Sequence, residues 1–127
     1  MRTIHTHDAP TPAGHYSQAV VHGGLVFVAG QLPIDPQRRD QPAGDVAQQT
    51  ERVLRNVESI LRAAGTDLAH LVQVTVYVSD ISLWGEVNRV YSAVLGDHRP
   101  ARAVVPVKDL HHGYLLEVQA VAALPEG

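Results

Sequence analysis

The chain has 127 residues, of which 45% are apolar and 18% are charged, and its formal net charge is −3 at pH 7. This length predicts a single domain covering residues 1–127, with enough buried surface for a core. The negative charge argues against a nucleic-acid partner, and the absence of cysteine excludes disulfides and thiolate metal sites. No segment has the length and apolarity of a signal peptide or membrane span, so we expect a soluble, cytoplasmic protein.

The N-terminal third predicts a hairpin followed by a loop. The first 14 residues contain two prolines and no periodicity, which indicates an irregular lead-in. Residues 16–29 read as two strands that fold back at Gly23 and Gly24, because a Gly-Gly pair supplies the positive φ of a tight turn. Residues 30–44 hold three more prolines and are expected to form a loop.

The clearest helix is predicted between Asp45 and Gly65. Apolar residues recur along one face from Val46 to Ala64, with Asp45 as the N-cap and Gly65 as a left-handed C-terminus. The opposite face interleaves arginines with glutamates, which is typical of a solvated helix face.

The remaining elements complete a mixed sheet. Residues 71–78 alternate strictly, with every second residue from Val72 to Val78 a valine, which predicts a half-buried strand. A second helix is expected from about Ser82 to Leu95, and residues 101–107 and 115–123 are two more strands. The order ββαβαββ favours an α+β fold: a sheet of about six strands with both helices on one face.

The last strand has one uniformly apolar side and one mixed side. Glu117 and Gln119 share the mixed side with Leu115 and Val121. A face that mixes polar with apolar residues is typical of a subunit interface, so we expect an oligomer.

Arg102 begins one predicted strand, and Glu117 lies inside the next. If these two strands pair as a hairpin, the two side chains would share one face. One interpretation is a structural ion pair that fixes the register. The other is an anion site, because the planar guanidinium of Arg102 grips a carboxylate with two parallel hydrogen bonds.

Six motifs occur in order along nearly the whole chain: GHYSQAV at 14–20, VAGQLPIDP at 28–36, QTxxVLxNVxxILxxAG at 49–65, VNRVY at 87–91, PAR at 100–102 and EVQAVA at 117–122. Together they resemble the RidA family, also called the YjgF family. The resemblance implies a chorismate mutase-like fold, a homotrimer and ligand clefts between subunits. It also implies hydrolytic deamination of enamines and imines such as 2-aminoacrylate to 2-keto acids and ammonia, without a cofactor or metal.

The resemblance assigns expected roles to individual residues. Arg102 matches the arginine that binds the substrate carboxylate, and Glu117 matches the acidic residue that positions water, so both are expected to be catalytic. Val104 replaces a cysteine whose backbone contacts the substrate in many members. The expected substrate-binding residues are Tyr16, Gly30, Asn88, Arg102 and Val104.

Other positions depart from the family pattern. His15 replaces a proline, Ala29 replaces a serine, and His111 belongs to an LHH sequence where LP is usual. These changes leave open a different activity class, a non-catalytic regulator that binds a small carboxylate or metabolite. A ribonuclease or translation inhibitor is a further alternative, which the acidic charge disfavours.

Histidines and aromatic residues outside these motifs are given structural interpretations. The close pairs His5/His7 and His111/His112 match no zinc-binding spacing, so we expect no metal. Trp84 and Tyr91 are expected to pack in the core or at an interface.

Overall fold

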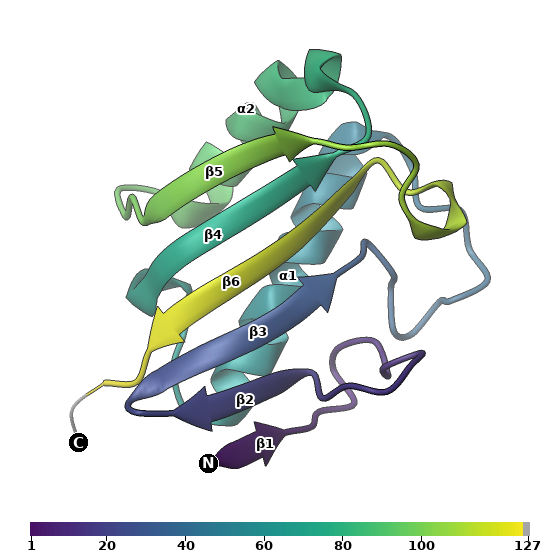
Figure 1. Ribbon diagram of the computed structural model, residues 1–127. Helices are drawn as coiled ribbons and strands as arrows, with labels where there is room; N and C mark the ends of the chain where they lie inside the picture. Colours follow the sequence, from purple (N-terminus) through teal and green to yellow (C-terminus); the bar gives the residue numbers. More distant parts are fainter. Residues whose placement is uncertain (126–127) are drawn as a thin grey trace.

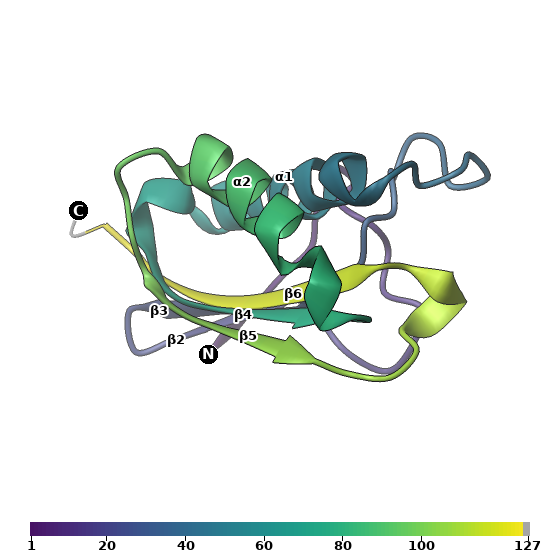
Figure 2. The same ribbon diagram turned by 90° about the horizontal axis from the view of Figure 1, so that it is seen from above.

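Within residues 1–125, which the computed structural model describes, six strands form one sheet in the order β1-β2-β3-β6-β4-β5 (Figure 1). The strands are β1 (Arg2–Ile4), β2 (Ala19–His22), β3 (Leu25–Gln31), β4 (Leu71–Val78), β5 (Ala101–Pro106) and β6 (Leu116–Ala123). Two helices, α1 (Val46–Ala64) and α2 (Trp84–Leu95), lie on the same face of the sheet (Figure 2). The α+β architecture predicted from the sequence is therefore confirmed.

Both ends of α1 follow from local chemistry. The Asp45 carboxylate accepts a hydrogen bond from the backbone N–H of Gln48 at 2.8 Å, and the Gln48 side chain accepts one from the N–H of Asp45 at 2.9 Å. This reciprocal pair forms a capping box. Gly65 ends the helix with φ 95°, a left-handed conformation that glycine adopts without strain.

The N-terminal strands confirm the hairpin and correct the lead-in. Gly23 and Gly24 both have positive φ, as the tight turn between β2 and β3 requires. Residues Arg2–Ile4, expected to be irregular, instead pair antiparallel with β2 and form an edge strand. Three residues are too few to show an alternating pattern, so the sequence gives this strand no signal.

The burial of side chains along β4 departs from the predicted alternation at Val72. Leu71, Val74 and Val76 are buried as core residues, but Val72 is 47% exposed. The pairing with β6 shifts register between Leu71 and Gln73, so Val72 is the extra residue of a β-bulge and turns away from the core.

The core lies between the sheet and the two helices. The apolar side of β6, from Leu116 to Ala122, is fully buried there, as its alternation predicted. The other face of the sheet carries no helix, and Phe27 on it is 44% exposed (Figure 2). On that face the Tyr77 hydroxyl donates a hydrogen bond to the Gln119 side chain at 2.7 Å.

Candidate functional site

Arg102 lies at the start of β5 and projects toward α2. It occupies the same row of the sheet as Val74, a buried residue on the helix-covered face. Its Nη1 donates a hydrogen bond to Oδ1 of Asn88 at 3.0 Å. The central carbon of its guanidinium lies 4.6 Å from the ring centroids of both Trp84 and Tyr91. One amide and two aromatic rings therefore surround the guanidinium.

The three contacts come from one face of α2. Trp84, Asn88 and Tyr91 are spaced by four and then three residues, which stacks them along one side of a helix. Aromatic faces attract a guanidinium through the ring quadrupole. The contacts fix the orientation of Arg102, and no described carboxylate lies within 4.0 Å of it.

A pocket opens beside the Arg102 guanidinium. Its lining residues come from the end of α2 and from the segment that leads into β5: Asn88, Tyr91, Ser92, Gly96, His98, Arg99, Pro100 and Arg102. Because Asn88 engages only one nitrogen of Arg102, the guanidinium can still form a two-pronged contact with a carboxylate at this pocket.

Glu117 belongs to a second group of residues on the other face of the sheet. It pairs with Tyr77 on β4, one step out of phase with the core-facing residues of β6. Opposite it, β3 contains a bulge between Val28 and Gln31. The Glu117 carboxylate lies against the α-carbon of Gly30 within this bulge, in the space that a side chain there would need.

Burial raises the pKa of Glu117, and the nearby His111 partly offsets this rise. Tyr16, which is 52% exposed, lines a small pocket together with Gly30 and His111. This second site therefore holds a carboxyl group that keeps its proton to higher pH than an ordinary glutamate.

The expected hairpin between the strands of Arg102 and Glu117 is wrong. β4 lies between β5 and β6, and β5 runs parallel to β4. The connection from β4 to β5 passes through α2, a crossover that alternation along a single strand cannot reveal. Arg102 and Glu117 consequently lie on opposite faces of the sheet, so within one chain they form neither an ion pair nor a common site.

The structure thus divides the expected site residues into two sets. Asn88 contacts Arg102, and Val104 lies one step further along the same side of β5, packed against the core. Tyr16 and Gly30 line the pocket beside Glu117. Sequence reasoning missed Trp84 and Tyr91, which contact Arg102 directly; their helical spacing from Asn88 was the available signal.

Neither a metal cluster nor a membrane-spanning helix is found in the described residues 1–125. Among residues 1–125, no group of three or more histidine, aspartate or glutamate side chains is arranged to hold a metal ion. None of the helices in this described part of the chain is long and apolar enough to cross a membrane.

Comparison with known proteins establishes the family. Residues 6–124 match the family model described as Endoribonuclease L-PSP. A RutC family protein of Pyrococcus abyssi is 44% identical over 119 residues, covering 94% of each chain. The chain belongs to the RidA (YjgF-type) family.

Two more members of the RidA family relate this chain to a named activity and to a solved structure. The 2-iminobutanoate/2-iminopropanoate deaminase of Homo sapiens is 37% identical over 121 residues, which is 95% of this chain and 88% of the human protein. The crystal structure of RidA from Psychrobacter sp. is 36% identical, with a TM-score of 0.92, covering 98% of this chain and 100% of that one.

Proposed function

We propose that this chain hydrolyses 2-imino acids and their enamine tautomers, such as 2-aminoacrylate, to 2-keto acids and ammonia. The observation that carries the proposal is Arg102, a guanidinium held by Asn88 and two aromatic rings with its remaining donors facing a pocket. The human and rat relatives named as imine deaminases support the same reaction.

The reaction needs little from the protein besides positioning. The enamine takes up a proton at carbon and becomes an imine; water then adds to the C=N carbon, and the nitrogen departs as ammonia, leaving a C=O group. Arg102 would hold the substrate carboxylate and so fix the plane of the imine. Glu117 would hold the attacking water and pass its proton to the departing nitrogen.

The raised pKa of Glu117 suits this role. A carboxyl group exchanges protons most effectively when its pKa lies close to the working pH, and burial moves Glu117 in that direction. The same burial removes bulk water from around the group, which strengthens its interaction with a reacting nitrogen.

The split between Arg102 and Glu117 leads us to place the complete cleft between two copies of the chain. The helix-free face of the sheet carries Glu117 together with partly exposed apolar residues such as Phe27 and Val121. A cyclic homotrimer uses two different surfaces of each copy at every interface. Such an assembly would bring Arg102 of one copy to Glu117 of its neighbour.

The test generates 2-aminoacrylate in situ from serine with a pyridoxal-phosphate dehydratase. We expect this protein to speed the release of ammonia and pyruvate beyond the rate in buffer, and Arg102→Ala to abolish the difference. A release rate that stays at the buffer value with the wild-type protein contradicts the deaminase assignment.

Ala29 and Val104 favour one alternative, a non-catalytic carboxylate-binding regulator. Both residues remove a polar or reactive side chain that is common at these positions in the family. A regulator would be stabilised by 2-keto acids through Arg102 without speeding hydrolysis, so the same assay combined with a melting curve separates the two functions. An RNA substrate, suggested by the description of the family model, fits poorly with a net charge of −3.

A further inference from the structure

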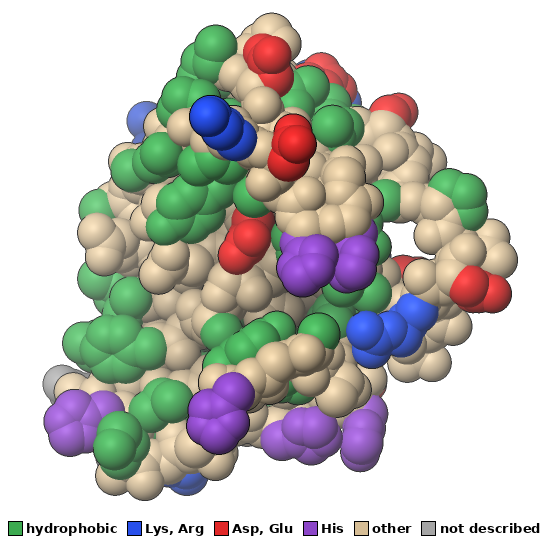
Figure 3. Space-filling model, turned by 45° about the vertical axis from the view of Figure 1, so that its right-hand side comes forward, with side chains coloured by type: hydrophobic (Ala, Val, Ile, Leu, Met, Phe, Trp, Pro, Cys, Tyr) green, Lys and Arg blue, Asp and Glu red, His purple; other side chains and the backbone are tan. Residues whose placement is uncertain are grey.

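The pocket beside Glu117 carries basic side chains that the proposed reaction does not use. Arg39, His111 and His112 line it together with Tyr16 and Gly30. Figure 3 shows two adjacent histidine side chains next to an acidic one, with Lys or Arg side chains further along the same face.

The two histidines are held side by side by an unusual backbone. Their rings stack with centroids 4.2 Å apart and planes 25° apart. His112 has φ 59°, and within residues 1–125 it is the single non-glycine residue with positive φ. Left-handed backbone in such a residue is uncommon and often occurs at binding sites, where surrounding contacts hold it.

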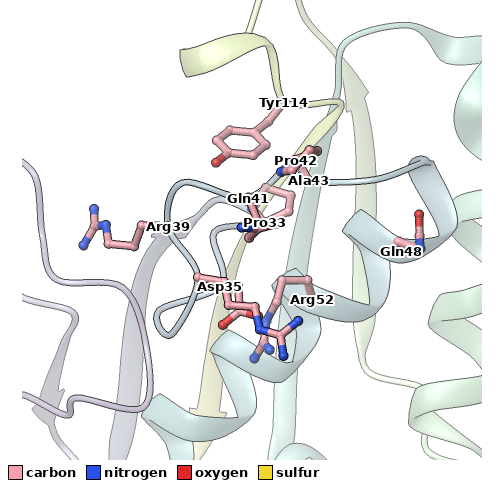
Figure 4. A pocket seen from close by; sticks show the side chains of 10 residues that line it. Pro33, Asp35, Arg39, Gln41, Pro42, Ala43, Gln48, Arg52 and Tyr114 are labelled. Atoms are coloured by element: carbon pink, nitrogen blue, oxygen red, sulfur yellow. The ribbon is translucent and has the colours of Figure 1, made fainter.

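Arg39 reaches the pocket from the loop between β3 and α1. Arg39 also borders a neighbouring pocket that Asp35, Arg52 and Arg38 line, but in Figure 4 its side chain extends away from Asp35 and Arg52. No salt bridge to Arg39 exists in the described part of the chain. Its charge is therefore available to an anion in the pocket.

We propose that this pocket binds a second acidic group on the substrate, so that the preferred substrates are 2-imino dicarboxylic acids of four or five carbons. The inference rests on the proposed deaminase function and adds the substrate class to it. A hydrocarbon side chain would gain little from one guanidinium and two imidazoles, whereas a carboxylate accepts charge-assisted hydrogen bonds from them. Water adds to the C=N carbon, and the nitrogen leaves as ammonia. The second carboxylate takes no part in the reaction and remains in the 2-keto product.

The kinetic test compares two imines that differ only at the far end. An L-glutamate oxidase generates 2-iminoglutarate, and an L-amino-acid oxidase acting on norvaline generates 2-iminopentanoate, which has a methyl group in place of the distal carboxylate. We expect kcat/KM to favour 2-iminoglutarate in the wild-type protein by about tenfold, the usual effect of a charge-assisted hydrogen bond.

Variants assign that preference to the pocket. Arg39→Gln and His112→Asn should each reduce kcat/KM for 2-iminoglutarate and leave 2-iminopentanoate unaffected; asparagine is chosen at 112 because it tolerates left-handed backbone. His111→Gln should also reduce the preference, but because His111 acts on the pKa of Glu117 its effect is measured as the ratio of the two kcat/KM values. Arg38→Gln is the matched control, since this neighbour lies in the same loop but lines the other pocket. Equal kcat/KM for the two imines, or a preference that survives all three variants, overturns the inference.

A binding measurement separates failure of the inference from failure of the deaminase proposal. Melting curves are recorded with 2-oxoglutarate and with 2-oxopentanoate, which do not require turnover. If neither imine is hydrolysed but 2-oxoglutarate alone stabilises the protein through Arg39, the dicarboxylate pocket stands and the deaminase function falls. If 2-iminopentanoate is hydrolysed and both keto acids stabilise equally, the deaminase stands and the pocket assignment falls.

Discussion

The carboxylate of Glu117 fills the space that a β-carbon on Gly30 would occupy. Gly30 does not have positive φ, so its backbone would accept other residues. The requirement for glycine at this position thus comes from close approach of Glu117 and not from backbone conformation. Because Glu117 is a flexible side chain, a larger residue at 30 would displace the carboxylate before it disturbed the strand.

Gly30→Ala should therefore separate function from folding. We expect the variant to melt within a few degrees of the wild type, because only the end of a side chain must move. Imine hydrolysis should fall sharply, since Glu117 no longer occupies its position. A variant that retains full activity would show that the Glu117 position is unimportant for the reaction.

Arg102→Ala tests the carboxylate anchor. Arg102 has no carboxylate partner in the described chain, so we expect a loss of stability of only about 1 kcal/mol from its aromatic and amide contacts. Stabilisation by 2-keto acids and imine hydrolysis should both disappear. Arg102→Lys should also fail, because an ammonium group cannot reproduce the two-pronged contact. A folded Arg102→Ala protein with wild-type activity would falsify the anchor assignment.

Trp84→Leu tests the aromatic support of Arg102. Loss of one cation–π contact at an exposed site corresponds to about 0.5–1 kcal/mol, so KM should rise roughly two- to fivefold with a smaller change in kcat.

Tyr91→Phe keeps the second ring and removes a buried hydroxyl that has no hydrogen-bond partner among the described residues. Its stability, measured by urea denaturation, should equal or exceed that of the wild type by up to about 1 kcal/mol.

Glu117→Gln should change how stability depends on pH. Burial raises the pKa of Glu117 above its ordinary value of 4.5, so the folded state holds the proton more tightly than the unfolded state does. Ionised Glu117 therefore destabilises the fold increasingly as pH rises from about 4.5 through the raised pKa, and below that window it has no such effect. The variant should gain stability relative to wild type across this window, as measured by melting curves at a series of pH values.

The proposed homotrimer predicts a particle of about three times 13.7 kDa in light scattering. Val121 lies on the helix-free face and is half-buried even in the single chain. The substitution Val121→Asp should dissociate the trimer, because a neighbouring copy packed on this face would bury an unpaired carboxylate. A wild-type protein that is monomeric at micromolar concentration would contradict a cleft shared between copies.

Local patterns in the sequence were sufficient for most elements. The capping residue Asp45, the glycine pair at 23 and 24 and the alternation along β6 each predict a conformation from neighbouring residues alone, and the structure confirms all three. The bulge at Val72 was not predicted. Val72 is the same residue type as Val74, Val76 and Val78, so the sequence alternation gives no sign that this one valine turns away from the core.

The sequence patterns do not show which strands are neighbours in the sheet. The position of β5 beside β4 depends on the crossover through α2, and no pattern within residues 101–106 records it. The assumed proximity of Arg102 and Glu117 failed for this reason. Tyr91 is buried in the core as expected. The contacts of Trp84 and Tyr91 with Arg102 depend on the same crossover, so they were not predicted.

The placement of Arg102 and Glu117 on opposite faces has a genetic consequence. If copies pack head to tail as proposed, each chain contributes the arginine to one cleft and the glutamate to another. A chain altered at Arg102 and a chain altered at Glu117 would both be inactive alone, yet a mixed ring of three contains about one cleft with both residues intact. Two defective alleles expressed in one cell would then complement each other, and activity would belong to the ring and not to any single chain.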